Sequence, residues 1–242
     1  MQWLTNWMMK EGPGVRKDEP KKTGLALFVS IILREPWELF KLNLLMLLLC
    51  IPVITIPANL VAAGRICGLM IEDEVVFFWR DYWRAFGQRA VASTLWGLFF
   101  AVLLGICGYS AFIYGQLGLH DMVYVAPAVI AICLTLLVLM VAVCLFTILS
   151  KQVCLPALVL LKSACLAALA KPIPILAGIA FAALLWLAHV IFYPASIFLP
   201  VVLNFSLGTL AMVFGAYKAT DFALQMLELV GSRQGAEESA SI

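Results

Sequence analysis

The sequence predicts an all-α fold: a polytopic transmembrane helix bundle of five to six spans, with an interfacial amphipathic elbow helix. Of the 242 residues, 64% are hydrophobic and only 12% are charged, whereas a soluble domain carries about 25% charged residues. The charges also avoid long stretches, and residues 172–217 contain no Lys, Arg, Asp or Glu. Because a charge at the centre of a membrane span costs roughly 2.5–3.5 kcal/mol, lipid is the expected solvent for much of the surface.

The same composition argues against several classes of function. A net charge of +2 is too small to suggest a nucleic-acid partner. The seven cysteines form no C-x-x-C pair and lie in or beside apolar stretches, so we interpret them as packing residues. The two histidines, His120 and His189, lie on different segments, and no catalytic motif is present. We therefore expect no enzyme activity, no cofactor and no metal.

The chain divides into three expected parts. Residues 1–38 are expected to be a cytoplasmic or interfacial N-terminal segment, with Trp3 and Trp7 as possible interfacial anchors. Residues 39–230 form the transmembrane helical domain. Residues 231–242 are polar and rich in small residues, which is typical of a disordered cytoplasmic tail.

The first apolar region, residues 39–71, is too long for one plain span and short for two. Pro52 disfavours helical geometry before it, whereas Thr55 and Pro57 are typical of a helix start. The pattern predicts a helix, a bend and a new helix, and the bend is either a kink or the apex of a hairpin. Seven Lys or Arg residues precede the apolar region's bend, and Arg80, Arg84 and Arg89 follow the region, so the positive-inside rule favours the hairpin.

The later spans follow from the charge distribution. They are expected at residues 90–115, 122–150, 173–192 and 197–217. The loop at residues 116–121 has no Lys or Arg and is expected outside, whereas residues 151–171 carry three lysines and are expected inside. Lys218 and Arg233 then place the C-terminus in the cytoplasm.

Small residues predict where helices approach closely. Gly97, Ala101 and Gly105 repeat every four residues and would give one smooth helix face. Gly208 and Gly215, with Ala211 between them, would give a second.

Two polar side chains are expected at membrane depth near the bend, Asn59 and Arg65. Arg65 lies roughly 12–15 Å along the second helix, and an ionisable residue within a span is a candidate functional residue. The alternative is that it snorkels towards the inner face or pairs with Glu72. The other polar groups able to line a transport path are few: Asn43, Asn204 and Thr209.

The most organised polar segment is residues 77–89. On a helix, Trp79, Tyr82, Trp83 and Phe86 share one aromatic face. This pattern suits an elbow helix in the inner interface, with its rings among the headgroups and its guanidinium groups towards phosphates. The candidate contacts with headgroups or a partner subunit are Trp79, Arg80, Asp81, Trp83, Arg84 and Phe86.

Three sequence elements carry a family resemblance. Asn43-Leu44-Leu45, Pro52-Val53-Ile54-Thr55-Ile56 and Asp81-Tyr82-Trp83-Arg84-Ala85-Phe86 resemble, in the same order, motifs of the YesL-like family of bacterial multi-pass integral membrane proteins, a domain of unknown function. The resemblance covers about residues 39–89. Arg65 falls where the family pattern has an apolar or aromatic residue, so the resemblance implies no role for it.

The resemblance implies a multi-pass protein of the bacterial cell (plasma) membrane. Its relatives are often encoded beside binding-protein-dependent sugar uptake systems. This implies a non-catalytic accessory subunit or partner of a carbohydrate ABC importer, which would contact the lipid bilayer and the importer's permease subunits. The alternative is an independent small-solute channel or transporter.

Overall fold

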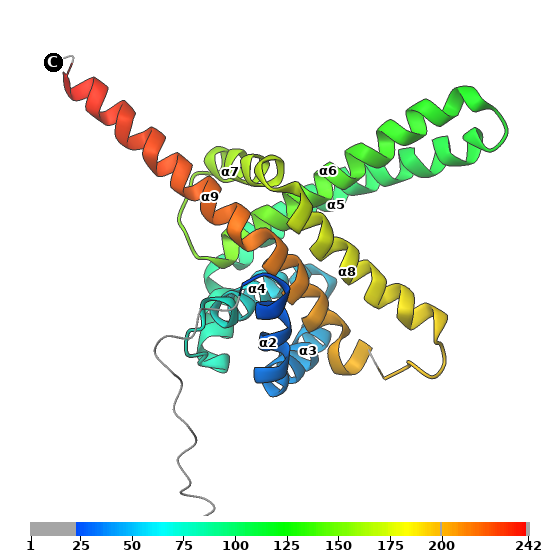
Figure 1. Cartoon of the computed structure of the whole chain (residues 1–242), viewed down its shortest axis with the longest axis horizontal. Helices are drawn as coiled ribbons and strands as arrows, with labels where there is room; N and C mark the ends of the chain where they lie inside the picture. Colours follow the sequence, from blue (N-terminus) through cyan, green and yellow to red (C-terminus); the bar gives the residue numbers. More distant parts are fainter. Residues whose placement is uncertain (1–22, 199, 241–242) are drawn as a thin grey trace, which may run out of the picture.

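A computed structural model describes residues 23–198 and 200–240 of the chain, with side chains as far as Leu229 (Figure 1). Trp3 and Trp7, the expected interfacial anchors, lie outside the described residues. Within these residues the structure consists of eight α-helices and contains no strand. The all-α prediction is confirmed.

The elements follow one another closely. The helices are α2 (Leu25–Arg34), α3 (Pro36–Leu49), α4 (Ile56–Glu72), α5 (Phe78–Gly118), α6 (Val125–Ser150), α7 (Ala157–Ala170), α8 (Pro172–Ile191) and α9 (Phe205–Ala240). The short turns are η1 (Val53–Thr55), η2 (Met122–Tyr124) and η3 (Pro200–Asn204). Among the described residues, five stretches are long and apolar enough to cross a membrane: Val53–Glu72, Phe78–Gly118, Met122–Ser150, Pro172–Ile191 and Pro200–Leu229. The chain is therefore a multi-pass membrane protein by length and composition.

Helices α3 and α4 form a hairpin rather than one kinked span. Near its apex, the Asn59 side-chain Nδ2 donates to the carbonyl of Met46 at 2.9 Å, although thirteen residues of straight helix would separate the two by about 20 Å. At its base, Arg34 pairs with Asp73 and reaches the carbonyl of Met70. The two arms therefore lie side by side both near the apex and at the base of the hairpin.

The tip of this hairpin is apolar, and its first arm, α3, is shorter than a full span, whereas η1 and α4 together are long enough for one. The fourteen residues of α3 extend about 21 Å, against about 30 Å for a hydrocarbon core. The hydroxyl of Thr55 donates to the carbonyls of Leu49 and Pro52 and so satisfies the end of α3. Ile51, Val53 and Ile54 are each more than 70% exposed. Because these exposed side chains are apolar, we expect the tip to lie among acyl chains.

Helix α4 is the centre of the fold. Eleven of its seventeen residues are buried, because α3, α5, α6 and α9 all pack around it. Helix α2 covers this core through Phe28, whose ring meets the edges of Phe181 and Phe214. Helix α7 packs against α6 and α9.

The expected elbow helix is not a separate element. Residues 77–89 and the span predicted from residue 90 are one continuous helix, α5, of 41 residues. The segment contains no proline, and its one internal weak point, Gly87, does not interrupt the helix. At about 61 Å, α5 is twice as long as a bilayer core. Its outer part runs beside α6 as a long arm (Figure 1).

The predicted small-residue faces have different outcomes. Gly208, Ala211 and Gly215 do lie against α8: a Cβ on Gly215 would sit 2.3 Å from the Pro174 carbonyl oxygen, and one on Gly178 would sit 2.4 Å from that of Ala211. The face Gly97–Ala101–Gly105 is only partly a packing face. A Cβ on Gly97 would meet the Pro57 ring at 2.3 Å, but one on Gly105 would meet nothing within 4 Å, and Ala101 is exposed. The prediction for Ala101 and Gly105 is wrong within this chain, because α5 has left α4 by that point.

Most of the segment expected to be a disordered tail is described as helix, and its disorder stays a prediction. Helix α9 continues through Ala240, and only residues 241–242 of the tail lie outside the described part. The segment has no proline, and its Ala, Glu, Gln and Arg residues favour helix, so a helix already formed over the apolar residues can propagate into it.

The α8–α9 contact gives a direct test. Gly215→Ala and Gly178→Ala each place a methyl group against backbone atoms that cannot rotate away, so we expect a loss of about 1–3 kcal/mol and a melting temperature about 2–12 °C lower in detergent. Gly105→Ala is the control, because its Cβ enters open space and alanine favours helix. Equal melting temperatures for all three variants would contradict this close approach.

The depth of the hairpin tip can be measured by cysteine labelling. In a chain whose exposed cysteines Cys133 and Cys154 are changed to serine, we expect Ile54→Cys in sealed vesicles to resist a membrane-impermeant maleimide from either side and to react after detergent is added. Leu119→Cys, in the loop after α5, is the accessible control. Labelling of Ile54→Cys in intact vesicles would mean that the tip reaches water.

Candidate functional site

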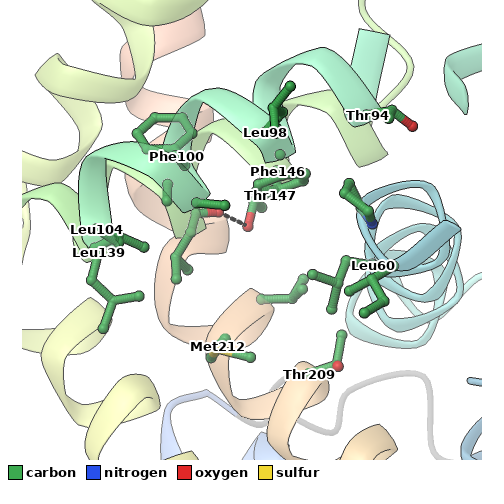
Figure 2. A pocket seen from close by; sticks show the side chains of 18 of the residues that line it. Leu60, Thr94, Leu98, Phe100, Leu104, Leu139, Phe146, Thr147, Thr209 and Met212 are labelled. Carbon is green, nitrogen blue, oxygen red and sulfur yellow. Dashed lines mark hydrogen bonds between the residues drawn. The ribbon is translucent and has the colours of Figure 1, made fainter. Parts of the chain in front are cut away.

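A groove of about 560 Å³ opens between α4, α5, α6 and α9, with η1 at one edge (Figure 2). Its walls are almost wholly aliphatic and aromatic. The large side chains that line it include Leu60, Leu98, Phe100, Leu104, Leu139, Phe146 and Met212. Ala101, predicted as a packing residue, lines this groove instead.

Among the residues that the structure describes, three threonines are the only polar side chains in the groove wall, and their hydroxyl groups already donate. Thr94 donates to the Ala90 carbonyl at 2.7 Å, and Thr147 donates to the Val143 carbonyl at 2.8 Å. Thr209 points to the Met46 sulfur at 3.9 Å. A molecule in the groove would therefore meet almost only apolar surface.

A set of four polar side chains lies beyond one end of the groove; we call Glu72, Lys151, Tyr217 and Asp221 the polar clamp. The Lys151 ammonium pairs with Asp221, donates to the Tyr217 carbonyl at 3.2 Å and lies 3.9 Å from the centre of the Tyr217 ring. The Tyr217 hydroxyl donates to Glu72. The clamp thus joins the ends of α4 and α6 to the middle of α9.

Burial has the largest effect on the pKa of the Lys151 ammonium group. The side chain is 9% exposed, and desolvation lowers the pKa of its ammonium group, although the hydrogen bond and charge of Asp221 act in the opposite direction. An ion pair with one buried partner is not strong evidence for stability. Its clearer role is geometric, because it fixes α6 against α9.

The clamp lies close to the groove. A Cβ on Gly64, in the groove wall, would sit 3.0 Å from the Ser150 Cβ, so α4 and α6 meet at this level. Thr147 in the wall precedes Lys151 by four residues, or about 6 Å along the helix. Nearby, Arg89 donates to the carbonyls of Gln152 and Val153. We call this end, with Arg34, Arg89 and Lys151, the basic end.

Asn43, considered above as a lining group for a transport path, is instead a structural connector. Its Nδ2 donates to the carbonyls of Pro200 and Val201 at 2.9 and 2.6 Å, and its Oδ1 accepts from the amides of Phe205 and Ser206 at 2.9 and 3.1 Å. It is completely buried. One side chain on α3 thereby satisfies both sides of the helix break at η3.

Asn59 is occupied in the same way. It donates to Met46 within the hairpin and accepts from the hydroxyl of Tyr82 on α5. Both side chains are buried. Sequence reasoning missed this pair because the two residues are brought together only when α3–α4 folds back beside α5.

Arg65 differs from the asparagines. Over the residues described, it makes no hydrogen bond or ion pair, and its predicted partner Glu72 accepts from Tyr217 instead. It is partly buried, close enough to Tyr217 to act on it electrostatically, and about 10 Å along α4 from Glu72. It does not line the groove. A functional role for Arg65 stays a prediction.

The predicted aromatic face of residues 77–89 is divided by the structure. Trp79 and Trp83 are 60% and 46% exposed. Tyr82, however, is fully buried, and Phe86 packs partly against the core. The expectation that all four rings lie among headgroups is therefore wrong for Tyr82 and Phe86, because α4 covers this side of α5.

The charged residues of the segment also have different roles. Asp81 accepts from the backbone amide of Phe77 at 3.0 Å, as a side chain in the first helical turn often does, and from Arg80. Arg80 lies 4.2 Å from the centre of the Phe77 ring, and Arg84 is exposed. Asp81 is thus a capping residue, whereas Trp79, Arg80, Trp83 and Arg84 remain available on the surface.

Replacement of Asn43 tests its role as a connector. Asn43→Leu leaves two buried amides and two carbonyls without their partner, so we expect a loss of about 2–4 kcal/mol and a melting temperature about 4–16 °C lower in detergent. Asn204→Leu is the matched control: Asn204 is also buried, but its Nδ2 has no hydrogen-bond partner in the described structure. A larger fall for Asn204→Leu than for Asn43→Leu would contradict this assignment.

Comparison with known proteins identifies one part of the chain. Residues 39–111, less than a third of the sequence, match the family model described as "Protein of unknown function, DUF624". The match covers the α3–α4 hairpin and most of α5, and it includes the three elements singled out in the sequence. No curated protein and no solved structure matches the chain.

Proposed function

We propose that this chain is a non-catalytic integral membrane protein that acts as an accessory partner of a bacterial carbohydrate ABC importer. Two observations support the family assignment behind this proposal: the YesL-like motifs of residues 39–89 and the family match over residues 39–111. The link to carbohydrate import rests on the resemblance.

One observation favours a partner over a channel or transporter. A solute path through a membrane needs polar groups that face it. Asn43 and Asn59 are buried and bonded inside the chain, and the groove wall is apolar. These residues are therefore poorly suited to carry a sugar, which presents many hydroxyl groups.

The orientation we propose follows from charge. The basic end carries Arg34, Arg89 and Lys151, and the positive-inside rule places such residues in the cytoplasm. The loop between α5 and α6 has no Lys or Arg and would lie outside. Because α9 leaves the bundle beyond the polar clamp (Figure 1), the C-terminus would be cytoplasmic. The membrane we propose is the plasma membrane of a bacterium.

The proposed docking surface is the exposed part of the first turns of α5, which we call the aromatic–basic ridge: Trp79, Arg80, Trp83 and Arg84. Exposed tryptophan and arginine side chains are enriched at interface hot spots. The two guanidinium groups would hold the ridge at headgroup level, where a membrane-spanning permease subunit presents the ends of its helices. The permease is thus the partner we assign to this surface.

Co-purification tests the proposal. We expect the tagged chain, at native expression, to co-purify with permease subunits of a sugar importer, and Trp79→Ala with Trp83→Ala to reduce the yield at least tenfold. The matched control is Tyr109→Ala with Phe112→Ala, which removes two exposed aromatic rings from the other end of α5. Purification of the wild-type chain alone from native membranes would argue against an importer partner.

Transport assays separate the two hypotheses. Liposomes that contain only this chain should show no flux of sugars or small ions above that of empty liposomes. A flux that requires the chain would favour the channel or transporter hypothesis and would leave the importer partnership without its main support.

A further inference from the structure

The groove lies at the depth of the hydrocarbon. Its inner end, at Thr147, is one helical turn from the polar clamp. Its other end is lined by Leu104 and Leu139, each fourteen residues, or about 21 Å of helix, from the loop that joins α5 to α6. The space therefore opens among acyl chains rather than towards water on either side.

Water is a poor occupant of this space. A buried water molecule needs two to four polar partners. The groove wall offers only three threonines, and two of them donate to carbonyls of their own helix. A void of about 560 Å³ would also deprive its walls of contact atoms. An apolar occupant is the favourable solution.

The size of the groove restricts that occupant further. A helix about 10–12 Å wide that rises 5.4 Å per turn fills roughly 420–610 Å³ per turn. The volume of the groove is close to that of one helical turn, which favours a slender occupant over a helical segment from a partner or from a second copy. Small-molecule sites commonly have this volume, and an unbranched hydrocarbon chain can follow the uneven wall formed by Leu60, Phe146 and Met212.

We propose that the groove binds one acyl chain of a membrane phospholipid. The chain would lie against α4, α5, α6 and α9, with Val53 and Ile54 of the hairpin tip at its edge. Because nearby polar groups of the clamp are already paired, binding depends on the length of the chain and not on the headgroup. This inference does not rest on the proposed partnership with an importer.

The test uses the full chain purified in detergent and a variant that fills the groove. Ala101→Trp puts an indole into the space from α5, whereas Ala126→Trp makes the same change at an exposed alanine of α6 outside the groove. Native mass spectrometry after addition of dioleoylphosphatidylcholine should show one retained lipid for the wild type and for Ala126→Trp. The retained fraction should fall at least fivefold for Ala101→Trp.

A second variant and a second measurement exclude misfolding as the cause. Ala142→Leu fills the groove from α6 with a smaller side chain and should also lower retention. The same lipid should raise the melting temperature of the wild type by about 3–6 °C, because it binds only the folded state, and should raise that of Ala101→Trp much less. Dioleoylphosphatidylglycerol should act like the phosphatidylcholine, whereas dihexanoylphosphatidylcholine should have little effect.

Three results would overturn the proposal. One is equal retention of lipid by the wild type and by both groove-filling variants. Another is a preference of more than tenfold for one headgroup over the other, which would place recognition outside the apolar wall. The third is a dimer that Ala101→Trp converts to a monomer, which would make a second copy the occupant.

Discussion

A membrane interior supplies no water to hydrogen-bond an interrupted helix, and this constraint governs the fold. Among the described residues, helices are interrupted at η1 and at η3, and in both places a side chain replaces missing hydrogen-bond partners. Thr55 covers the carbonyls at the end of α3, and Asn43 serves both sides of the η3 break. The Asn43 bonds also fasten α3 to α9. The hydrogen bonds that Asn43 makes at the η3 break therefore also hold the α3–α4 hairpin in place.

Asn59, Tyr82 and the polar clamp also join helices through hydrogen bonds and an ion pair. The apolar groove is the space that remains between the helices they join. Asn59 joins the hairpin to Tyr82 of α5, and the polar clamp joins α4, α6 and α9 at the basic end. Beyond these two contacts the arm of α5 and α6 diverges from α9 (Figure 1). Helices in lipid gain little from further burial of apolar surface, so no strong force closes the gap. The apolar groove therefore arises where the α5–α6 arm and α9 diverge at membrane depth.

The sequence predicted the features of the fold that depend on neighbouring residues in the chain. The spans, the bend at Pro52 and the close approach at Gly215 follow from hydropathy, proline geometry and small residues. The same signals failed where the outcome depends on a distant helix. Gly105 has the spacing of a packing residue, but α5 has left α4 there, and Tyr82 belongs to an aromatic pattern but is covered by the hairpin. The groove could not be predicted, since it is lined by four helices far apart in the sequence.

The hairpin links the two regions to which we assign function. Its arms are bonded to η3 through Asn43 and to the first turns of α5 through Asn59 and Tyr82. Tyr82 directly precedes Trp83 of the aromatic–basic ridge in the sequence. Its tip supplies Val53 and Ile54 to the edge of the groove. A shift of the hairpin would thus move the groove wall and the aromatic–basic ridge together, because packed helices transmit displacement rather than absorb it. Coupling of this kind requires that a ligand bind two hairpin positions with different affinity. An acyl chain against the tip can bind two hairpin positions with different affinity only if the tip moves. Any communication between the groove and the ridge therefore depends on the depth of the tip.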